Sequence, residues 1–401
     1  MSLHDVVVVG AGPVGAAFAL ALAESGFDVL ALDARPEGAI AQSDRSLALS
    51  HGSRLIFERL GVWGAVAANP QAVTPITAID ISQRGGFGSA RIEAAGEGLP
   101  ALGYVVSYRA LQAALDDGLR RHRIPVRHRT AVRAIEPAFD RARVITDATS
   151  AAEISNTRSS LPGKAKAEVH TRLAVVADGG GALVPDVLRH RHDYHQTAVT
   201  AKLWMKDPHG GLAFERFTPE GPMALLPDGD HYGLVWTATP PQADGLLAMP
   251  EAEFLIALQH RFGARVNGFM RVDDRRAFPL RLDYARDVVA RRTVLIGNAA
   301  QSLHPVAGQG FNLGVRDAYE LAQELLRAPS AQTGDSAQLA RYAASRRIDR
   351  ASAIAFTRTL LAVFGNDARA LRFPRGLALT LLDSIAPAKR ALTRTMLFGW
   401  H

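Results

Sequence analysis

Runs of apolar residues alternate with short polar or glycine-rich breaks along most of the chain, which is typical of an α/β fold. Near the N-terminus, Val6–Val9 is a continuous run of β-branched residues and predicts a strand buried on both faces. A helix-like stretch at Ala16–Ser25 follows, Gly26 ends it, and Val29–Leu32 predicts a second buried strand. This succession predicts a βαβ unit, the building block of a parallel sheet.

A second pattern, the alternation of single apolar and polar residues, occurs at Thr77–Ser82 and over much of Met223–Thr237. It predicts strands of an antiparallel sheet with one buried face. Although these strands are far apart in the sequence, we expect them to form one inserted domain. Between them the pattern predicts a helix at Leu111–Arg121 and short strands near Val126, Ala131–Ile135, Val144–Thr146 and Arg172–Ala177.

The last part of the chain is predicted to be mostly helical. Helices are expected at Pro250–Phe262, from Gly310 to Leu325 and from Ser336 to Phe364, with a short strand at Thr293–Gly297. Pro387 divides the tail into two short helices. One segment, Ala148–Lys166, is rich in Ser, Ala, Thr and Asn and has little periodicity, which predicts an exposed loop.

The length of 401 residues allows two domains with a large core. The chain has no cysteine, which excludes disulfides, thiolate metal sites and a nucleophilic cysteine. Its histidines show no metal-ligand spacing, so no metal is expected. No secretory leader is visible and no run reaches the ~18 apolar residues of a membrane-spanning helix. These features predict a cytoplasmic protein.

The net charge of +7 is compatible with nucleic acid, an anionic membrane or an anionic cofactor as partner. No nucleic-acid motif is present, so no nucleic-acid partner is expected. Basic residues gather in the segment Arg369–Trp400, where they are interleaved with leucines. The segment fits two interpretations: a helical cap packed on the protein, which we favour, and a surface that lies on an anionic bilayer.

The turn between the first two predicted strands carries the pattern G-x-G-x-x-G, in Gly10, Gly12 and Gly15. The first glycine allows a tight turn, the second lets the backbone approach a pyrophosphate, and the third lets helix and strand pack closely. Asp33 follows about 20 residues later, where a carboxylate accepts ribose hydroxyl groups. We predict a dinucleotide site that includes Gly10, Gly12, Pro13, Val14, Gly15, Asp33, Ala34 and Arg35.

A second glycine-rich loop lies nearly the whole chain away, in Val294–Asp317. Two glycines without side chains let the backbone approach a flat ring, and the N–H groups at the start of the following helix favour electron-rich oxygens. Such a loop can hold the carbonyl edge of an isoalloxazine. We predict contact with the ring system from Pro305, Gly308, Gln309, Gly310, Phe311 and Asn312.

Together these motifs resemble those of the single-component FAD-dependent aromatic hydroxylases. The early GAGPVG, a central VVADGGG and the late G-x-A-A-x-x-x-H-P-x-x-G-Q-G-x-N carry the resemblance. Within this group the chain is most similar to the ubiquinone-biosynthesis hydroxylases, through Asp44–Trp63, Gly221–Pro227 and Gly308–Ala318. The late motif reads GNAAQ, similar to the branch that acts on 2-polyprenyl-6-methoxyphenol. The resemblance is weakest at Ala148–Lys166 and in the last few dozen residues.

The resemblance implies a Rossmann-like FAD-binding domain of the para-hydroxybenzoate hydroxylase type, with an inserted antiparallel β-sheet substrate domain and C-terminal helices. The FAD-binding domain is expected at 1–75, 100–182 and 273–345, the substrate domain at 76–99 and 183–272, and the helical segment at 346–401. The resemblance also implies that Arg45 and Asp178 lie near the diphosphate, that Arg109 lies near the adenine, and that Asn298 accepts a hydrogen bond from the ribityl chain.

The implied activity is hydroxylation of a polyprenylated phenol with O2 and transient NAD(P)H, through a flavin hydroperoxide. The sequence assigns no catalytic residue; His304 is interpreted as a loop histidine bonded to the backbone rather than as a base. The implied setting is cytoplasmic, with peripheral contact to the inner membrane and to other quinone-pathway proteins. Two alternatives remain: a non-catalytic flavin-binding subunit, and a flavoenzyme of the same fold acting on another aromatic or prenyl substrate, such as a reductase or halogenase.

Overall fold

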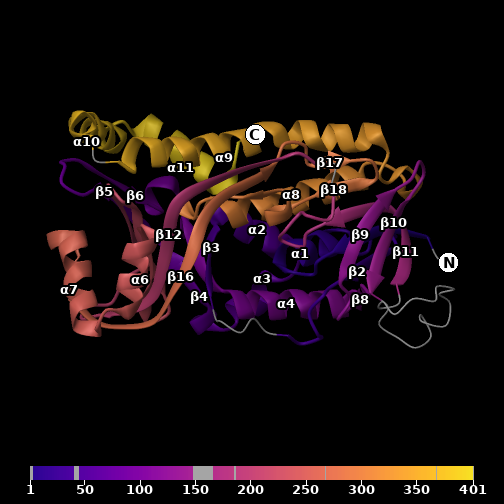
Figure 1. Cartoon of the computed structure of the whole chain (residues 1–401), viewed down its shortest axis with the longest axis horizontal. Helices are drawn as coiled ribbons and strands as arrows, with labels where there is room; N and C mark the ends of the chain where they lie inside the picture. Colours follow the sequence, from indigo (N-terminus) through magenta and orange to yellow (C-terminus); the bar gives the residue numbers. More distant parts are fainter. Residues whose placement is uncertain are drawn as a thin grey trace.

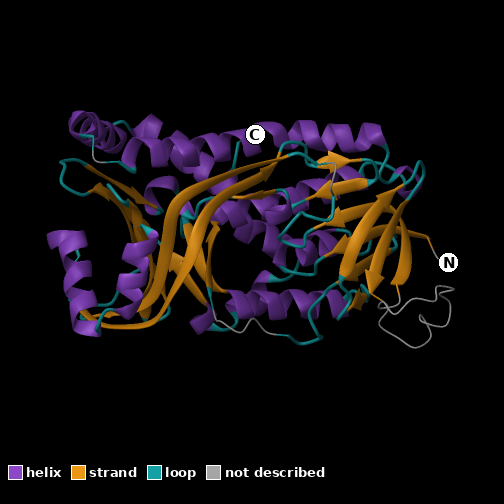
Figure 2. Ribbon diagram, in the orientation of Figure 1, coloured by secondary structure: helices purple, strands orange, loops and turns teal. Residues whose placement is uncertain are grey.

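The computed structural model describes residues 3–39, 45–147, 166–184, 187–266, 268–366 and 368–400. The expected loop at Ala148–Lys166 lies outside the described residues except for its last position. The described chain forms two large sheets, a small sheet between them and a layer of helices along one side (Figure 1, Figure 2).

The first sheet contains the predicted βαβ unit. Its strands lie in the order β17-β18-β11-β1-β2-β8, and β10 joins β9 to the edge of β11. The pairs β18–β11, β11–β1, β1–β2 and β2–β8 are all parallel. Val6, Val7 and Val8 are fully buried in this sheet, as the apolar run predicts. The strands are β1 (Leu3–Val9), β2 (Val29–Leu32), β8 (Val126–Arg127), β9 (Val132–Pro137), β10 (Ala142–Asp147), β11 (Lys166–Val176), β17 (Val289–Ala290) and β18 (Thr293–Leu295).

Three helices pack beside this sheet: α1 (Pro13–Ala21), α4 (Tyr108–Arg121) and α8 (Gln309–Leu326). Helix α1 begins three residues earlier than the apolar pattern predicts. Pro13 occupies the first helical turn, where its fixed φ suits the helix and its missing N–H costs nothing. The start of α1 therefore lies directly at the glycine-rich turn.

The second sheet has the order β19-β16-β12-β15-β14-β13-β5-β6. Helices α6 (Pro240–Ala248) and α7 (Glu251–Phe262) cover one of its faces, on the side away from α1 and α4 (Figure 1). Its strands are β5 (Ala78–Gln83), β6 (Ser89–Glu93), β12 (Arg189–Met205), β13 (Leu212–Thr218), β14 (Gly221–Asp228), β15 (His231–Ala238), β16 (Phe269–Ala285) and β19 (Gln301–Ser302). The distant strands predicted to form one antiparallel sheet thus do so, although β5 and β13 pair in parallel.

A three-stranded sheet, β3-β7-β4, connects the two large sheets. It consists of β3 (Ser46–Ser50), β4 (Val73–Ile76) and β7 (Gly103–Ser107). Helices α2 (His51–Arg59) and α3 (Trp63–Ala67) follow β3 in the chain. Ile76 of β4 and Val105 of β7 pack against Ala213 of β13, which fixes the small sheet to the second large one.

The last helices form a layer that runs along both large sheets (Figure 1). They are α9 (Ser336–Phe364), α10 (Arg369–Ser384) and α11 (Ala386–Phe398), and Pro387 lies in the first turn of α11. Two expected domain limits fall inside continuous elements. The limit at 272/273 cuts β16, which pairs with β12 along nearly its whole length, and the limit at 345/346 cuts the continuous helix α9.

Candidate functional site

The glycine-rich turn after β1 has the geometry that its spacing predicts. Gly10 has a φ of +99°, and a Cβ there would lie 2.7 Å from the carbonyl oxygen of Ala177. A Cβ on Gly15 would lie only 2.0 Å from the carbonyl oxygen of Gly10. These two positions accept no larger residue, because the turn and the packing of α1 leave no room.

Gly12 is different, because the fold itself does not require a glycine there. Its φ of −67° and ψ of −179° are available to any residue, and a Cβ would meet nothing within 4 Å. Gly12 also precedes the first turn of α1, whose N–H groups have no partners within the helix. The open space beside Gly12 is where a pyrophosphate would approach the helix N-terminus.

Asp33 lies at the end of β2 and is 4% exposed. Its carboxylate accepts hydrogen bonds from the backbone N–H of Ala11 (2.9 Å) and from both the backbone and the guanidinium of Arg35 (2.8–3.0 Å). Burial alone would raise the pKa of Asp33, but these donors outweigh burial and lower it. A charged acceptor is therefore held beside the glycine-rich turn, with Ala34 in the loop between the two paired residues.

Arg45 and Arg109 lie close together at the start of α4. The guanidinium of Arg45 lies 4.3 Å from the ring centroid of Tyr108, and the Arg45 carbonyl accepts the Tyr108 N–H. Arg109 is exposed in the first turn of α4. Gln112, on the same face one turn later, donates from Nε2 to the carbonyl of Ala11 (3.0 Å). The start of α4 is thereby attached to the glycine-rich turn, with both arginines beside it.

Gln112 is a site residue that the sequence analysis missed. It is 5% exposed, and its Oε1 has no hydrogen-bond partner among the described residues. In the sequence it is simply a polar residue in a helix, so only its burial reveals it.

The late motif reaches the same place from the other end of the chain. It forms β18, a short 3-10 turn η4 (Gly297–Ala299), β19, a second turn η5 (Val306–Gly308) and then α8. A Cβ on Gly314 of α8 would lie 2.8 Å from the Cα of Gly297, and one on Gly297 would lie 3.0 Å from Val14 of α1. Close packing of these small residues brings the two glycine-rich motifs into one site.

Asp178 and Asn298 end neighbouring parallel strands of the first sheet. Asp178 is exposed, and its Oδ1 accepts the N–H groups of Gly180 (2.9 Å) and Gly181 (2.8 Å). Asn298 is exposed in the turn η4, next to the buried Ala299, whose carbonyl would lie 2.5 Å from a Cβ on Gly181. Their side chains therefore share the carboxyl edge of the sheet, where ligands of α/β folds bind.

The loop before α8 is held in place from two sides. Asn312 is 3% exposed; its Oδ1 accepts the N–H of Ser50 (2.8 Å) and its Nδ2 donates to the carbonyls of Ala48 (3.0 Å) and Gly308 (2.7 Å). On the other side, Gln309 Nε2 lies 3.5 Å from a carbonyl oxygen of α11. The side chain of Asn312 is thus used within the protein, so it positions the loop rather than offering polar atoms to a ligand.

The remaining predicted loop residues are accessible to different degrees. Gly308 has a φ of +60° and begins α8, whereas Gly310 needs no special backbone and a Cβ there would only touch Leu303 at 3.8 Å. Pro305 is exposed and Phe311 is partly buried against the core of the first sheet. Gly310 therefore has room beside it, as an approaching ring would require.

His304 is almost fully buried, and its Nδ1 accepts the N–H of Val306 (3.2 Å). The ring packs edge-on against Tyr194, with 5.3 Å between centroids. Burial lowers the pKa of His304 to about 4. The histidine is therefore neutral at physiological pH and bonded to the backbone, as the sequence analysis favours.

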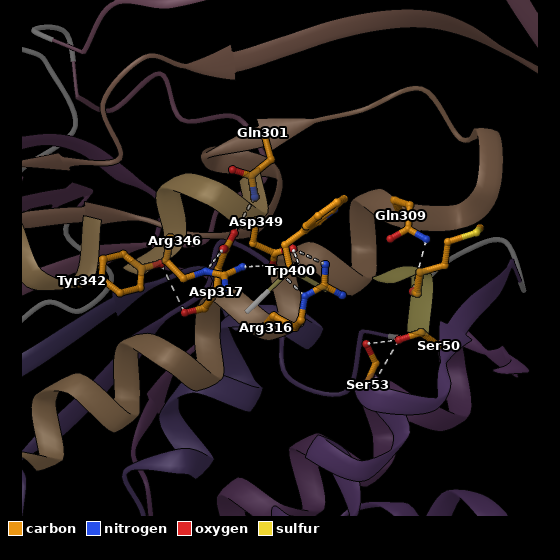
Figure 3. A network of polar contacts seen from close by, with 11 residues as sticks. Ser50, Ser53, Gln301, Gln309, Arg316, Asp317, Tyr342, Arg346, Asp349 and Trp400 are labelled. Atoms are coloured by element: carbon orange, nitrogen blue, oxygen red, sulfur yellow. Dashed lines mark hydrogen bonds and ion pairs between the residues drawn. The ribbon is translucent and has the colours of Figure 1, made fainter. Parts of the chain in front are cut away.

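Behind the loop lies a buried network of charges that the sequence did not reveal (Figure 3). Asp349 of α9 accepts hydrogen bonds from Arg316 (2.9 Å), Arg346 (2.7 Å) and the N–H of Trp400 (3.1 Å). Asp317 accepts from Arg346 (2.9 Å). The network joins α8, α9 and the end of the chain, and so supports the loop that precedes α8.

Gln301, the residue that makes the late motif read GNAAQ, belongs to this network. Its Nε2 donates to Asp317 (2.5 Å) and its Oε1 accepts from Arg350 (2.8 Å). The Arg350 guanidinium also donates to the carbonyl of Ala285 (2.9 Å). The amide supplies one donor and one acceptor, which satisfies a carboxylate and a guanidinium together.

The assembled site fits FAD. It offers open space at a helix N-terminus where a pyrophosphate could lie, a buried carboxylate beside the same turn, and a glycine loop with open space beside Gly310. The sequence model of a family described as an FAD binding domain matches residues 4–357 of the chain.

Two relatives resemble the chain over almost its whole length. The ubiquinone hydroxylase UbiL of Rhodospirillum rubrum is 33% identical, over 97% of this chain and 88% of that protein. The 3-demethoxyubiquinol 3-hydroxylase of Escherichia coli is 30% identical, over 96% of each chain.

Solved structures share the fold. The p-nitrophenol 4-monooxygenase PnpA of Pseudomonas putida superposes with a TM-score of 0.74 at 18% identity, covering 99% of this chain and 98% of that one. Aklavinone-11 hydroxylase, in its complex with FAD and aklavinone, gives 0.67 at 19% identity over 91% and 70% of the two chains. The sequence matches and the shared architecture agree: the chain belongs to the FAD-dependent aromatic monooxygenases of ubiquinone biosynthesis.

Proposed function

We propose that the protein adds a hydroxyl group to the ring of a polyprenylated phenol, a quinone precursor, using NAD(P)H and O2. The observation that carries this proposal is the meeting of two motifs from opposite ends of the chain. Gly12 and Asp33 provide a dinucleotide-binding edge, and the Gly308–Gly310 loop reaches the same site through the contact of Gly297 with Gly314 and Val14. Neither motif alone would indicate an aromatic hydroxylase.

Different residues of the site would bind different parts of FAD. The Gly12 turn, Arg45 and Arg109 would hold the diphosphate and adenine side, and Asp33 would accept the ribose hydroxyls. Asn298 and the loop would hold the ribityl chain and the ring. When bound, FAD would accept a hydride from NAD(P)H and activate O2, so that one oxygen atom is transferred to the phenol.

The protein would position the flavin ring and the substrate relative to each other. The loop that faces the ring is fixed by Asn312 on one side and by α11 on the other, so the reacting groups would be held at short range. For the oxygen to reach the phenol, the protein would also have to keep water from the reacting oxygen. The chain carries a single G-x-G-x-x-G after a strand, which fits an NAD(P)H that visits without a Rossmann domain of its own.

Product analysis tests this function. Purified protein is incubated with FAD, NADH or NADPH, air and a set of prenylphenols, and the products are analysed by mass spectrometry. We expect a product with one added oxygen atom and oxidation of NAD(P)H that depends on the phenol. A product with two added hydrogens or a halogen would indicate another flavoenzyme of the same fold, and no turnover would indicate a non-catalytic subunit.

We further propose that α10 contacts the surface of an anionic membrane, where a polyprenyl substrate resides. Phe373, Leu377, Leu381 and Ile385 recur every four residues, so they form one stripe, and each is 43–65% exposed. Exposed Arg372, Arg390 and Arg394 lie on α10 and α11. None of the described helices is both long and apolar enough to cross a bilayer. An apolar stripe with basic neighbours supports shallow, reversible binding to anionic lipid.

A further inference from the structure

One carboxyl group in the second large sheet has a placement that the proposed function leaves unused. Glu215 lies in the middle of β13. Its chain neighbours Phe214 and Arg216 face the helices on the outer side of the sheet: Phe214 packs in the α6/α7 core and Arg216 donates to the carbonyl of Arg261 in α7. Because side chains alternate along a strand, Glu215 faces the opposite, inner side.

The inner side of the sheet is linked by packing contacts to the Gly308–Gly310 loop. Ala213, on the same face as Glu215, packs against Val105 of β7. Val105 is paired with Ala48 of β3, and the Cβ of Ala48 lies 3.4 Å from where a Cβ on Gly308 would be. Packing contacts thus lead from the face of the sheet that carries Glu215, through β7 and β3, to this loop.

The other neighbours of Glu215 complete an enclosure. Phe217, two residues along the strand, stacks on Phe364 at the end of α9, with 4.2 Å between centroids. Ile81, beside Glu215 on β5, packs against the small apolar cluster that includes Leu397 of α11. The walls around Glu215 thus come from β7, α9 and α11, and α11 is also the helix that Gln309 of the loop approaches.

The face of the sheet that carries Glu215 is more accessible than the opposite face. Ala224 and Val235 continue the row that begins at Glu215, and all three side chains keep part of their surface accessible. On the outer face of the same strands, Met223 and Leu234 are at most 1% exposed. The row that contains Glu215 is therefore less tightly covered than the outer face of the same strands.

The carboxyl group of Glu215 also lacks a partner. Within the described part of the chain, no cation and no hydrogen-bond donor contacts it. The row on its face of the sheet reaches a charged residue only at its far end, Arg276 on β16. Although Glu215 keeps part of its surface accessible, its partial burial without a nearby cation raises its pKa to about 8. Such a group costs stability, which is a reason to ask what it does.

We propose that Glu215 is a catalytic residue that binds the hydroxyl group of the phenol and takes its proton. This proposal rests on the proposed function. The O–H bond of the phenol breaks, its proton passes to a carboxylate oxygen of Glu215, and the electron pair stays on the phenolate oxygen. No redox change occurs in this step; the oxidant remains O2. The phenolate pushes electron density into the ring, which favours formation of a C–O bond between a ring carbon and one atom of O2. That ring carbon then loses its hydrogen as a proton, the other atom of O2 leaves as water with two electrons supplied by NAD(P)H, and the proton held by Glu215 returns to the phenolate oxygen of the product.

The environment of Glu215 suits this transfer. A phenol has a pKa of about 10, roughly two units above that of Glu215 and roughly six above that of an ordinary glutamate. Matching the two acidities lowers the free-energy cost of moving the proton. A neighbouring arginine or lysine would lower the pKa of the carboxyl and weaken the base, so the absence of a cation near Glu215 is consistent with the role.

The test compares a phenol with its methyl ether in wild-type holoenzyme and in Glu215→Gln. The probes are 2-geranylphenol and 2-geranylanisole, which differ only in the proton that Glu215 would take. We expect kcat for the phenol to fall at least about 100-fold in Glu215→Gln. For the ether, wild type and variant should agree within about twofold, because the ether has no proton to transfer. Bound FAD should be the same in both proteins.

Two further variants keep the test decisive. Asp80→Asn removes a carboxylate from the neighbouring strand that pairs with Arg265 on the outer side, and should leave turnover of the phenol unchanged within about twofold. Glu215→Asp keeps a carboxyl group but shortens the side chain by one carbon. It should lower kcat for the phenol less than Glu215→Gln does. If Glu215→Gln does not fold, the comparison of phenol and ether is made with Glu215→Asp.

Equal losses on the phenol and the ether would mean a structural role and overturn the proposal, as would unchanged turnover of the phenol in Glu215→Gln. Absence of any turnover by wild type overturns the proposed function itself. The two failures are therefore distinguishable.

Discussion

Two glycines of the same turn are present for different reasons. Gly15 is required by the fold, because a Cβ there would lie 2.0 Å from the carbonyl oxygen of Gly10. Gly12 has an ordinary extended backbone and open space beside it. The sequence pattern predicts both as one fingerprint, and only the structure separates the packing glycine from the one that leaves room for a ligand.

This difference predicts opposite outcomes for two substitutions. Gly12→Val should fold, with a free energy of unfolding of the FAD-free protein within about 1 kcal/mol of wild type, but should not retain FAD because the side chain occupies the pyrophosphate space. Gly15→Val should fail to give folded protein. Denaturant unfolding and the absorbance of released flavin measure both. Retention of FAD by a folded Gly12→Val would remove this turn from the site.

His304 predicts how stability depends on pH. Its folded pKa of about 4 lies below the unfolded value of about 6.5, so the unfolded chain binds more protons between these two values. The free energy of unfolding should therefore fall, by up to about 3 kcal/mol from this residue, as the pH drops from 6.5 to 4. His304→Asn does not titrate in this range and should lose that part of the slope. Urea unfolding at several pH values compares the two, and identical slopes would show that His304 is not buried as a neutral ring.

At the scale of elements, the ion network explains how α9 supports the site. Asp349 and Asp317 are each 1% exposed and hold Arg316 and Arg346 between α8 and α9. Removing one carboxylate leaves buried guanidinium groups without a counter-charge, which costs far more than the pair contributes.

We therefore expect Asp349→Ala to lower the free energy of unfolding by about 3–5 kcal/mol. Glu58→Ala, which breaks the exposed pair with Arg54 in α2, should cost less than about 1 kcal/mol. Denaturant unfolding of the two variants makes the comparison. Similar small losses in both would mean that water reaches the network and screens it.

The strands of the first sheet could be predicted because continuous runs of apolar residues are typical of strands that are buried on both faces. Val29–Leu32 is buried throughout and forms a strand with those bounds, and the long helix at Ser336–Phe364 also matches. The small connecting sheet was missed, because β3 and β4 have only four or five residues, too few for a clear period. The strand β12 was missed for another reason. Its first half, RHRHDYHQ, is largely polar, and its extended form is held by pairing with β16.

Some residues of the candidate site could likewise be predicted from the sequence, and others could not. The glycine turn, Asp33 and the late loop are visible in the sequence because their chemistry needs particular residues at fixed spacing. Glu215, Gln112 and the Asp349 network could not be predicted from the sequence, because a charged or polar residue in a strand or helix normally lies on the surface. Their burial depends on how segments distant in the sequence pack together, which no local sequence pattern predicts.

At the scale of the whole molecule, the exposed stripe on α10 predicts membrane binding. A variant with Phe373, Leu377 and Leu381 all changed to Ser should keep its fold, because these side chains are exposed, and should bind anionic liposomes several-fold less than wild type. Wild-type binding should weaken at high salt, since the basic neighbours contribute by attraction to anionic lipid. Liposome co-sedimentation with anionic and neutral lipid measures this.

Replacing Ile256 by Ser provides a matched control, because Ile256 is 70% exposed on α7, away from α10. Equal binding of the stripe variant, the control and wild type would leave α10 as a packing element only. Circular dichroism of each variant confirms that the fold is intact.

The central claim is that the two glycine motifs build one FAD site at which an oxygen atom from O2 enters a prenylphenol. The most direct measurement is the isotopic composition of the product formed by the holoenzyme from 2-geranylphenol and NAD(P)H under 18O2, with Gly12→Val as the inactive control. The account predicts a hydroxylated product that contains one atom of 18O from wild type and none from the control. A product whose new oxygen comes from water, or consumption of NAD(P)H that yields only hydrogen peroxide, would contradict it.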